Sequence, residues 1–80
     1  MFYVYLLQSL ADPGRRYVGF SEDLRKRLRD HNHGKSTHTS KFRPWKLVTY
    51  IAFSDREQAL EFERYLKTSS GIAFANKRLR

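Results

Sequence analysis

The pattern of apolar and polar positions predicts three strands. Residues Phe2 to Leu7 are rich in β-formers and alternate between two faces, which is typical of a strand. The turn-forming sequence Asp12-Pro13-Gly14 follows, so a second strand at Arg16 to Phe20 should pair with the first as a hairpin. A third strand is predicted from Lys46 to Phe53, after a polar loop that Pro44 closes.

Helix-capping sequences predict the remaining elements. Ser21, followed by two acids, fits the N-cap of a helix that runs to about Asn32, with Gly34 suited to its end. Ser54 with Glu57 fits a capping box for a second helix.

The second helix should run to about Thr68, where Ser69-Ser70-Gly71 breaks it, and residues 72–79 form a short last helix. The order β-β-α-β-α-α predicts an α+β fold in which helices flank a small three-stranded sheet, mixed or antiparallel. A chain of 80 residues leaves room for one domain only, residues 1–80.

Composition narrows the function classes. There are 0 cysteines, which removes disulfides, thiolate zinc sites and cysteine nucleophiles. No apolar run approaches the ~20 residues of a membrane span, and the apolar start lacks the flanks of a signal peptide. We therefore expect a cytoplasmic protein with no membrane partner.

Positive charge is the strongest compositional signal. Lys and Arg number 16 against 8 Asp and Glu, giving a net charge of +8. Residues 25–46 hold eight of these cations and one acid, Asp30. Such a segment can neutralise phosphates and release counterions, which predicts a nucleic-acid partner. The alternative is a solvated basic surface that only maintains solubility. The candidate contacts are Arg25, Lys35, Lys41, Arg43 and Lys46, with Gly19 as a point of close approach for phosphate.

Several polar residues should face the sheet or border an apolar stripe. Hairpin pairing places Tyr5 and Tyr17 on one face, where ordinary cross-strand packing is the simpler interpretation. On a helical wheel His31 falls inside the apolar stripe of the first helix, and Arg27 at its edge. Glu63 borders the apolar stripe of the second helix, where a partly buried carboxylate needs a cation or a metal. The simpler interpretation of Glu63 is an ion pair with the next-turn lysine.

These residues, taken together, resemble the GIY-YIG endonuclease domain over roughly Phe2 to Leu79. Tyr3-Val4-Tyr5 and Tyr17-Val18-Gly19 resemble its two named motifs, although Tyr3 replaces the first glycine. Arg27, His31 and Glu63 resemble its arginine, histidine and metal-binding glutamate. The resemblance is greatest to the short bacterial branch in which the domain stands alone, and extends to the N-terminal nuclease domain of the excision-repair endonuclease. The segments that carry it are Tyr3–Ser9, Arg27–Asn32 and Glu63–Lys67.

The resemblance implies DNA phosphodiester hydrolysis with one Mg²⁺ or Mn²⁺ held by Glu63. It implies that Arg27 binds phosphate, that Tyr17 takes a proton from the attacking water, and that Tyr5 completes the hydrogen-bond network. His31 would shuttle protons or orient a tyrosine. Tyr3 and Asn76 are further candidates, the latter as the family's C-terminal asparagine. The identity of the general base stays open.

We expect structure-selective cleavage, because no element that reads a base sequence is visible, and DNA as the substrate, with RNA as an alternative. Two other functions stay open: a nucleic-acid-binding module without catalysis, and a nuclease subunit that a protein partner activates.

Overall fold

A computed structural model, covering residues 1–80, contains the three strands and three helices in the predicted order. The strand bounds are β1 (Phe2–Ser9), β2 (Arg16–Ser21) and β3 (Trp45–Phe53). The helix bounds are α1 (Leu24–Asn32), α2 (Arg56–Leu66) and α3 (Ser69–Arg78), with one 3-10 turn, η1 (Ser40–Phe42), in the predicted loop. The central strand β1 pairs antiparallel with both neighbours in the order β2-β1-β3, so the α+β prediction is confirmed and the sheet is antiparallel throughout.

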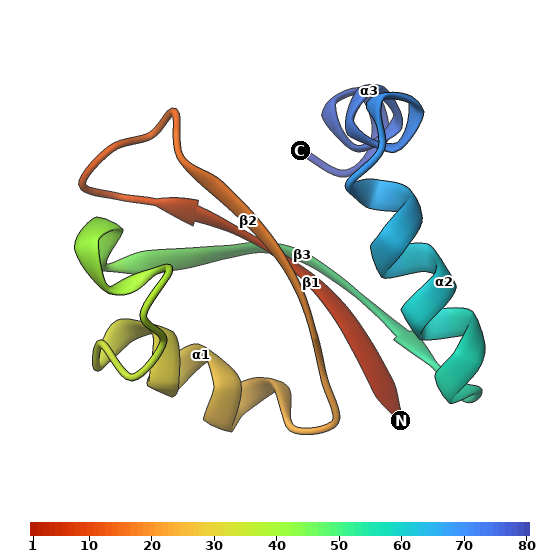
Figure 1. Ribbon diagram of the computed structural model, residues 1–80, viewed down its shortest axis with the longest axis horizontal. Coiled ribbons are helices and arrows are strands. Elements are labelled where there is room, and N and C mark those ends of the chain that lie inside the picture. The colour runs from red at the N-terminus through yellow and green to blue at the C-terminus, as the bar shows by residue number, and fades with distance from the viewer.

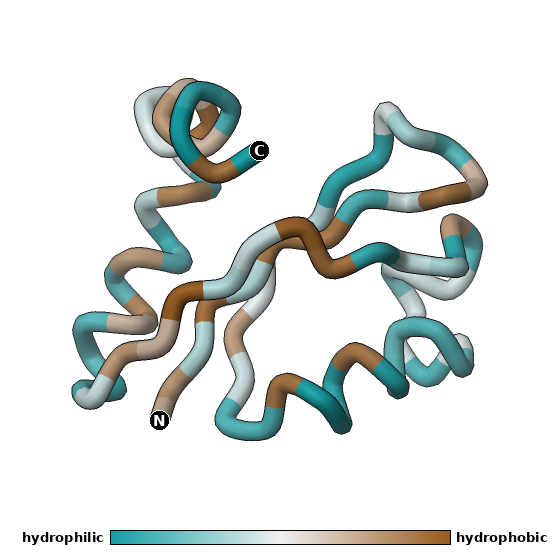
Figure 2. The backbone as a smooth tube through the Cα atoms, turned by 180° about the vertical axis from the view of Figure 1, so that it is seen from behind, coloured by the Kyte–Doolittle hydropathy of each residue, from teal (hydrophilic) through white to brown (hydrophobic).

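The sheet is covered on both faces (Figure 1). Val4 and Leu6 of β1 pack with buried residues of α2 and α3 on one face, while Tyr5 and Leu7 pack with Trp45 and the side of α1 on the other. The predicted alternation of β1 is therefore confirmed, because each face of the strand has a helical layer to pack against. Figure 2 shows hydrophobic positions along the strands, whereas α1 and the loop after it are largely hydrophilic. No helix combines the length and the apolar character needed to span a membrane.

The predicted N-caps of α1 and α2 are wrong. The Asp23 side chain, not Ser21, accepts from the first-turn amide of Lys26 at 3.1 Å, so α1 begins two residues later and has no acid in its first turn. Asp55, not Ser54, caps α2 by accepting from Gln58 N at 2.9 Å. In each case a carboxylate close to the serine is the acceptor that meets the free amide. Gly34, with φ +76°, ends α1 as predicted.

The predicted break between α2 and α3 is misplaced. Thr68 caps α3 by accepting from Gly71 N at 3.1 Å, so residues 69–71 form the first turn of a helix that is longer than expected. Gly71 is needed for close packing, because a Cβ there would lie 1.8 Å from the backbone oxygen of Tyr65. The glycine therefore allows the two helices to meet instead of ending one of them.

Candidate active site

Four elements bring the predicted polar residues together. Tyr5 comes from β1 and Tyr17 from β2, and their ring centroids lie 6.2 Å apart. His31 of α1 packs against both, with ring centroids 5.8 Å from Tyr5 and 5.0 Å from Tyr17. The charges of Arg27, one turn earlier on α1, and of Glu63 on α2 act on Tyr5, and Arg27 also interacts with Tyr17. The grouping of Tyr5, Tyr17 and His31 expected from alternation and the helical wheel is confirmed.

Gly19 makes room for this cluster. Tyr5 and Gly19 are direct neighbours across β1 and β2. A Cβ at Gly19 would lie 2.4 Å from both Cζ and Oη of Tyr5, and 2.9 Å from Cε2 of Tyr17. From the sequence, Gly19 was expected to allow close approach of phosphate, but it is buried and the space over it holds the Tyr5 phenol. Its structural reason is therefore packing within the site.

His31 is fully buried, and both of its ring nitrogens have partners. Its Nε2 lies 2.9 Å from the Tyr5 hydroxyl and its Nδ1 lies 2.7 Å from the Thr39 hydroxyl. Tyr5 and Thr39 are each 1% exposed, so water does not compete for these hydrogen bonds. Burial, followed by the charge of Arg27, lowers the pKa of His31, so the imidazole is neutral at pH 7.

Only one arrangement of protons satisfies this network. His31 Nε2 is the only hydrogen-bond partner of the Tyr5 hydroxyl, so it is the acceptor for the Tyr5 proton. The neutral imidazole then carries its proton on Nδ1 and donates it to Thr39 Oγ1, whose own proton is directed to the backbone oxygen of Ser36 at 3.5 Å. The Tyr5 oxygen keeps a lone pair, with the positive charge of Arg27 acting on it. This arrangement fits the second of the two roles expected of His31, that of orienting a tyrosine.

Tyr5 keeps its proton at neutral pH. Burial raises the pKa of Tyr5 to about 12, opposed by Arg27 and reinforced by Tyr17. Interaction with Tyr5 in turn raises the pKa of Arg27. Since Tyr5 and His31 are buried, they can only position other groups, and the partly exposed members Tyr17, Arg27 and Glu63 are those that a ligand can touch.

Glu63 offers a single carboxylate at the rim of the site. Its side chain is 19% exposed, and Oε2 accepts from Lys67 Nζ at 3.3 Å, the ion pair of the simpler interpretation. No group of three or more His, Asp or Glu side chains gathers to enclose a metal. Glu63 therefore suits an ion that retains water and binds substrate oxygens, as Mg²⁺ does, and does not suit zinc, which requires several protein ligands.

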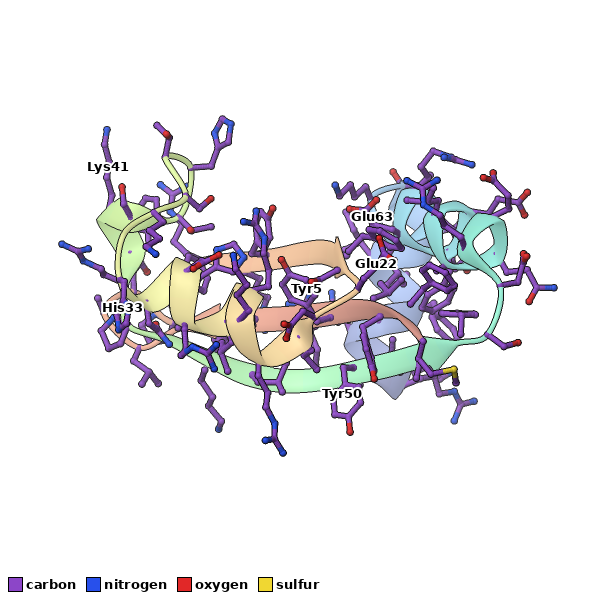
Figure 3. All side chains as sticks on the ribbon, turned by 90° about the horizontal axis from the view of Figure 1, so that it is seen from below. Tyr5, Glu22, His33, Lys41, Tyr50 and Glu63 are labelled. Atoms are coloured by element: carbon purple, nitrogen blue, oxygen red, sulfur yellow. The ribbon has the colours of Figure 1, made fainter.

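The other predicted residues lie around this centre (Figure 3). Tyr3 is outside it, because its ring packs on Tyr50 at 5.9 Å toward the β3 edge of the sheet. Asn76 on α3 accepts from Arg16 Nη1 at 2.8 Å, in a groove that Tyr17 also lines. Figure 3 shows Lys41 at the end of the molecule opposite Glu63, with Tyr5 between them. The five predicted cationic contacts, Arg25, Lys35, Lys41, Arg43 and Lys46, are all exposed.

Asn32, Trp45 and Thr39, which hold the loop after α1 in place, were not predicted from the sequence. Asn32 Nδ2 donates to the backbone oxygen of Trp45, and the Trp45 amide donates back to Asn32 Oδ1. Trp45 Nε1 donates to the Thr39 backbone oxygen at 2.8 Å, which fixes Thr39 beneath His31. A threonine in a polar loop carries no periodicity, so nothing in the sequence marks it.

Comparisons with known proteins agree with this geometry. The family model described as the GIY-YIG catalytic domain matches residues 1–76. "Structure-specific endonuclease subunit SLX1" of Candida dubliniensis is 40% identical over 71 residues, covering 80% of this chain and 25% of that protein. The SLX1 homolog of Giardia intestinalis is 35% identical over 65 residues, covering 76% of this chain and 18% of that protein. The chain thus spans a quarter or less of the length of these two relatives.

Two shorter relatives match more of their own length. A UPF0213 protein of Streptococcus pneumoniae is 36% identical over 66 residues, covering 81% of this chain and 65% of that protein. The solution structure of a UPF0213 protein from Bacillus halodurans superposes with a TM-score of 0.59 at 27% identity, covering 99% of this chain and 87% of that one.

Proposed function

The chain belongs to the GIY-YIG catalytic domain family, and from that membership we propose that it is an endonuclease that hydrolyses DNA phosphodiester bonds with one divalent metal ion. The observation that carries the proposal is that Tyr17 packs on the buried Tyr5–His31 pair, while the charges of Arg27 and Glu63, from two further elements, act on Tyr5. Simple packing does not require a guanidinium, two phenols and a carboxylate at one place.

DNA of particular structure is the substrate that the comparisons favour. Relatives from Candida dubliniensis and Giardia intestinalis are named structure-specific endonuclease subunits. The net charge of +8 suits a polyanion, and the exposed cations of residues 25–46 supply contacts to its phosphates. Phosphate contacts hold a strand without reading its bases, which agrees with selection by structure.

Arg27 binds the phosphate in this mechanism. Its guanidinium stays charged and offers paired donors that match phosphate oxygens. Interaction with Tyr5, whose hydroxyl is fixed by His31, raises the pKa of Arg27 and favours its charged form beside the site before the substrate arrives. A fixed cation of this kind stabilises the charge that develops on the phosphate without reorganising during the reaction.

Tyr17 and Glu63 complete the site. Solvent reaches Tyr17 but not Tyr5, so we assign to Tyr17 the proton of the attacking water, after Tyr17 has released its own proton to solvent. Buried Tyr5 keeps its proton. Glu63 would hold Mg²⁺ or Mn²⁺ through its carboxylate, with water and substrate oxygens as the other ligands. The chemistry supplied by a bound ion is Lewis-acid stabilisation of the phosphate and the leaving oxygen.

Cleavage of a panel of labelled DNAs tests this proposal. The panel contains a plasmid, a duplex, a single strand, a flap and a four-way junction, each incubated with Mg²⁺, with Mn²⁺ or with EDTA. We expect cleavage of branched or single-stranded DNA that requires metal, and slowing of about 10²-fold or more in Tyr17→Phe if it transfers the proton. Cleavage that continues in EDTA would contradict the metal requirement.

A partner-activated subunit is the second candidate, because both SLX1 relatives carry the word subunit in their names and are several times longer than the matched region. That version predicts DNA and metal binding by the chain alone, with cleavage only after a partner is added. A binding module without catalysis predicts equal DNA binding with and without metal, and no cleavage under any condition.

A further inference from the structure

A groove opens beside Tyr17, between β2 and the α2–α3 pair. It encloses about 410 Å³, and its polar lining consists of Arg16, Lys67, Asn76 and Arg80. In Figure 1 the chain leaves α3 and turns back toward β2, which brings its last residues to this groove. The groove adjoins the active site, because Tyr17 lines both and Lys67 contacts Glu63.

The polar lining is cationic and includes no Asp or Glu side chain. Arg16 donates to an amide oxygen, that of Asn76, and neither Arg16 nor Arg80 takes part in an ion pair. Burial and the charge of Arg16 lower the pKa of Arg80, so the two guanidinium groups repel each other across the groove. Two arginines held together without an acid form a place that an anion would stabilise.

The rest of the groove wall is apolar. Side chains from β2, α2 and α3 supply it, and among them Ile72 is 51% exposed. Cations beside an apolar wall and an aromatic ring match a nucleotide, which has a charged phosphate and a flat base. The groove volume lies in the range of small-ligand sites, about 300–1,000 Å³. A groove of this size accommodates one nucleotide and not a DNA duplex, whose major groove alone is about 12 Å wide.

We infer that this groove binds one nucleotide of an unpaired DNA strand next to the scissile bond, with the phosphate on Arg16 and Arg80 and the base against the apolar wall. The inference rests on the proposed nuclease function and deepens it by naming the strand that the site selects. A duplex cannot place a base in the groove without unpairing, so the groove favours substrates that already have an unpaired strand beside the cut.

Binding measured in EDTA tests the groove separately from cleavage. Fluorescence anisotropy would compare a labelled single-stranded oligonucleotide with its duplex, for the wild type and for the double variant Arg16→Ala/Arg80→Ala. The matched control is Lys77→Ala/Arg78→Ala, which removes the same charge from exposed positions of α3 outside the groove. We expect the groove variant to bind the single strand at least about tenfold more weakly, because it lacks both guanidinium groups that bind the phosphate.

The groove variant should also lower the salt slope of single-strand binding by about 0.7, because the protein no longer neutralises the one phosphate in the groove. In the wild type, the Asn76 side-chain amide should shift in NMR spectra when the single strand is added, and should not shift with inorganic phosphate at equal concentration.

Equal loss of single-strand binding in the groove and control variants, or a shift of Asn76 with phosphate alone, would overturn the inference. The binding assay contains no metal and does not depend on cleavage. If the groove variant loses single-strand binding but the wild type never cleaves DNA, the proposed function is refuted and the groove remains a nucleotide site. Cleavage by the groove variant at the wild-type rate and selectivity would refute the groove alone.

Discussion

The close approach of Tyr5 to Gly19 makes Gly19→Ala the most exacting test of the packing beneath the site. The new Cβ would lie 2.4 Å from two atoms of the Tyr5 phenol, whereas carbon atoms in contact are about 3.5–4.0 Å apart. Tyr5 would have to move by more than about 1 Å. Because Tyr5 is 1% exposed, nothing around it yields freely.

Two costs follow from that movement. Overpacking of a filled interior costs about 1–3 kcal/mol. Breaking the 2.9 Å hydrogen bond to His31 and leaving its buried groups unpaired costs about 1–3 kcal/mol more. We therefore expect the free energy of unfolding to fall by about 2–6 kcal/mol, a large part of the 5–15 kcal/mol typical of a domain.

Urea unfolding followed by far-UV circular dichroism and by the fluorescence of Trp45 would measure this loss. The matched control is Gly14→Ala, where the new Cβ meets only Asp12 Oδ1, at an ordinary 3.6 Å, and stability should change by no more than about 0.5 kcal/mol. If Gly19→Ala is as stable as the control, the close packing of Tyr5 on Gly19 is wrong.

Three further predictions follow from the same contacts. Thr39→Val should lower the free energy of unfolding by about 1–3 kcal/mol because it leaves His31 Nδ1–H unpaired, whereas Thr39→Ser should keep the wild-type stability. In the wild type, ¹⁵N NMR should report the proton of His31 on Nδ1, and a proton on Nε2 would refute the network. The pKa of His31 is lowered in the folded state, so below about pH 6.5 the unfolded chain binds more protons than the folded protein. The free energy of unfolding should therefore decrease as pH falls, by up to about 1.4 kcal/mol per pH unit from this residue, until His31 of the folded protein is also protonated. The His31 ring signals should stay those of a neutral imidazole below pH 6.5, and titration at or above its ordinary pKa would contradict this. Gly71→Ala should destabilise the protein by about 1–3 kcal/mol or more in thermal unfolding, because its Cβ meets the backbone oxygen of Tyr65, and an unchanged melting temperature would show that the helices do not meet this closely.

The strand pattern could be predicted because each face of β1 is packed. Alternation then separates Tyr5 from Val4 without ambiguity, and the antiparallel hairpin brings Tyr17 to the same side. The helical wheel placed His31 correctly for a similar reason, since α1 has only one face against the sheet. Convergence of the site followed from these two periodicities.

Helix ends and long-range contacts were harder to predict. Serine and aspartate lie close together before α1 and α2, and the sequence does not show which side chain meets the free amide. Gly71 reads as a helix breaker because periodicity does not show that its backbone packs against the end of the preceding helix. The groove cations Arg16 and Arg80 are far apart in the sequence and lie outside the dense basic segment at residues 25–46, so charge density alone does not mark them.

Single-turnover cleavage by Glu63→Gln and Glu61→Gln in Mg²⁺ tests the central claim most directly. Both variants remove one charge from α2, but Glu61 is exposed and lies outside the cluster. On a DNA that the wild type cuts, we expect Glu63→Gln to be at least about 100-fold slower, and Glu61→Gln to match the wild type. Wild-type rates for Glu63→Gln, or equal loss in both variants, would contradict a metal site at Glu63 and with it the proposed mechanism.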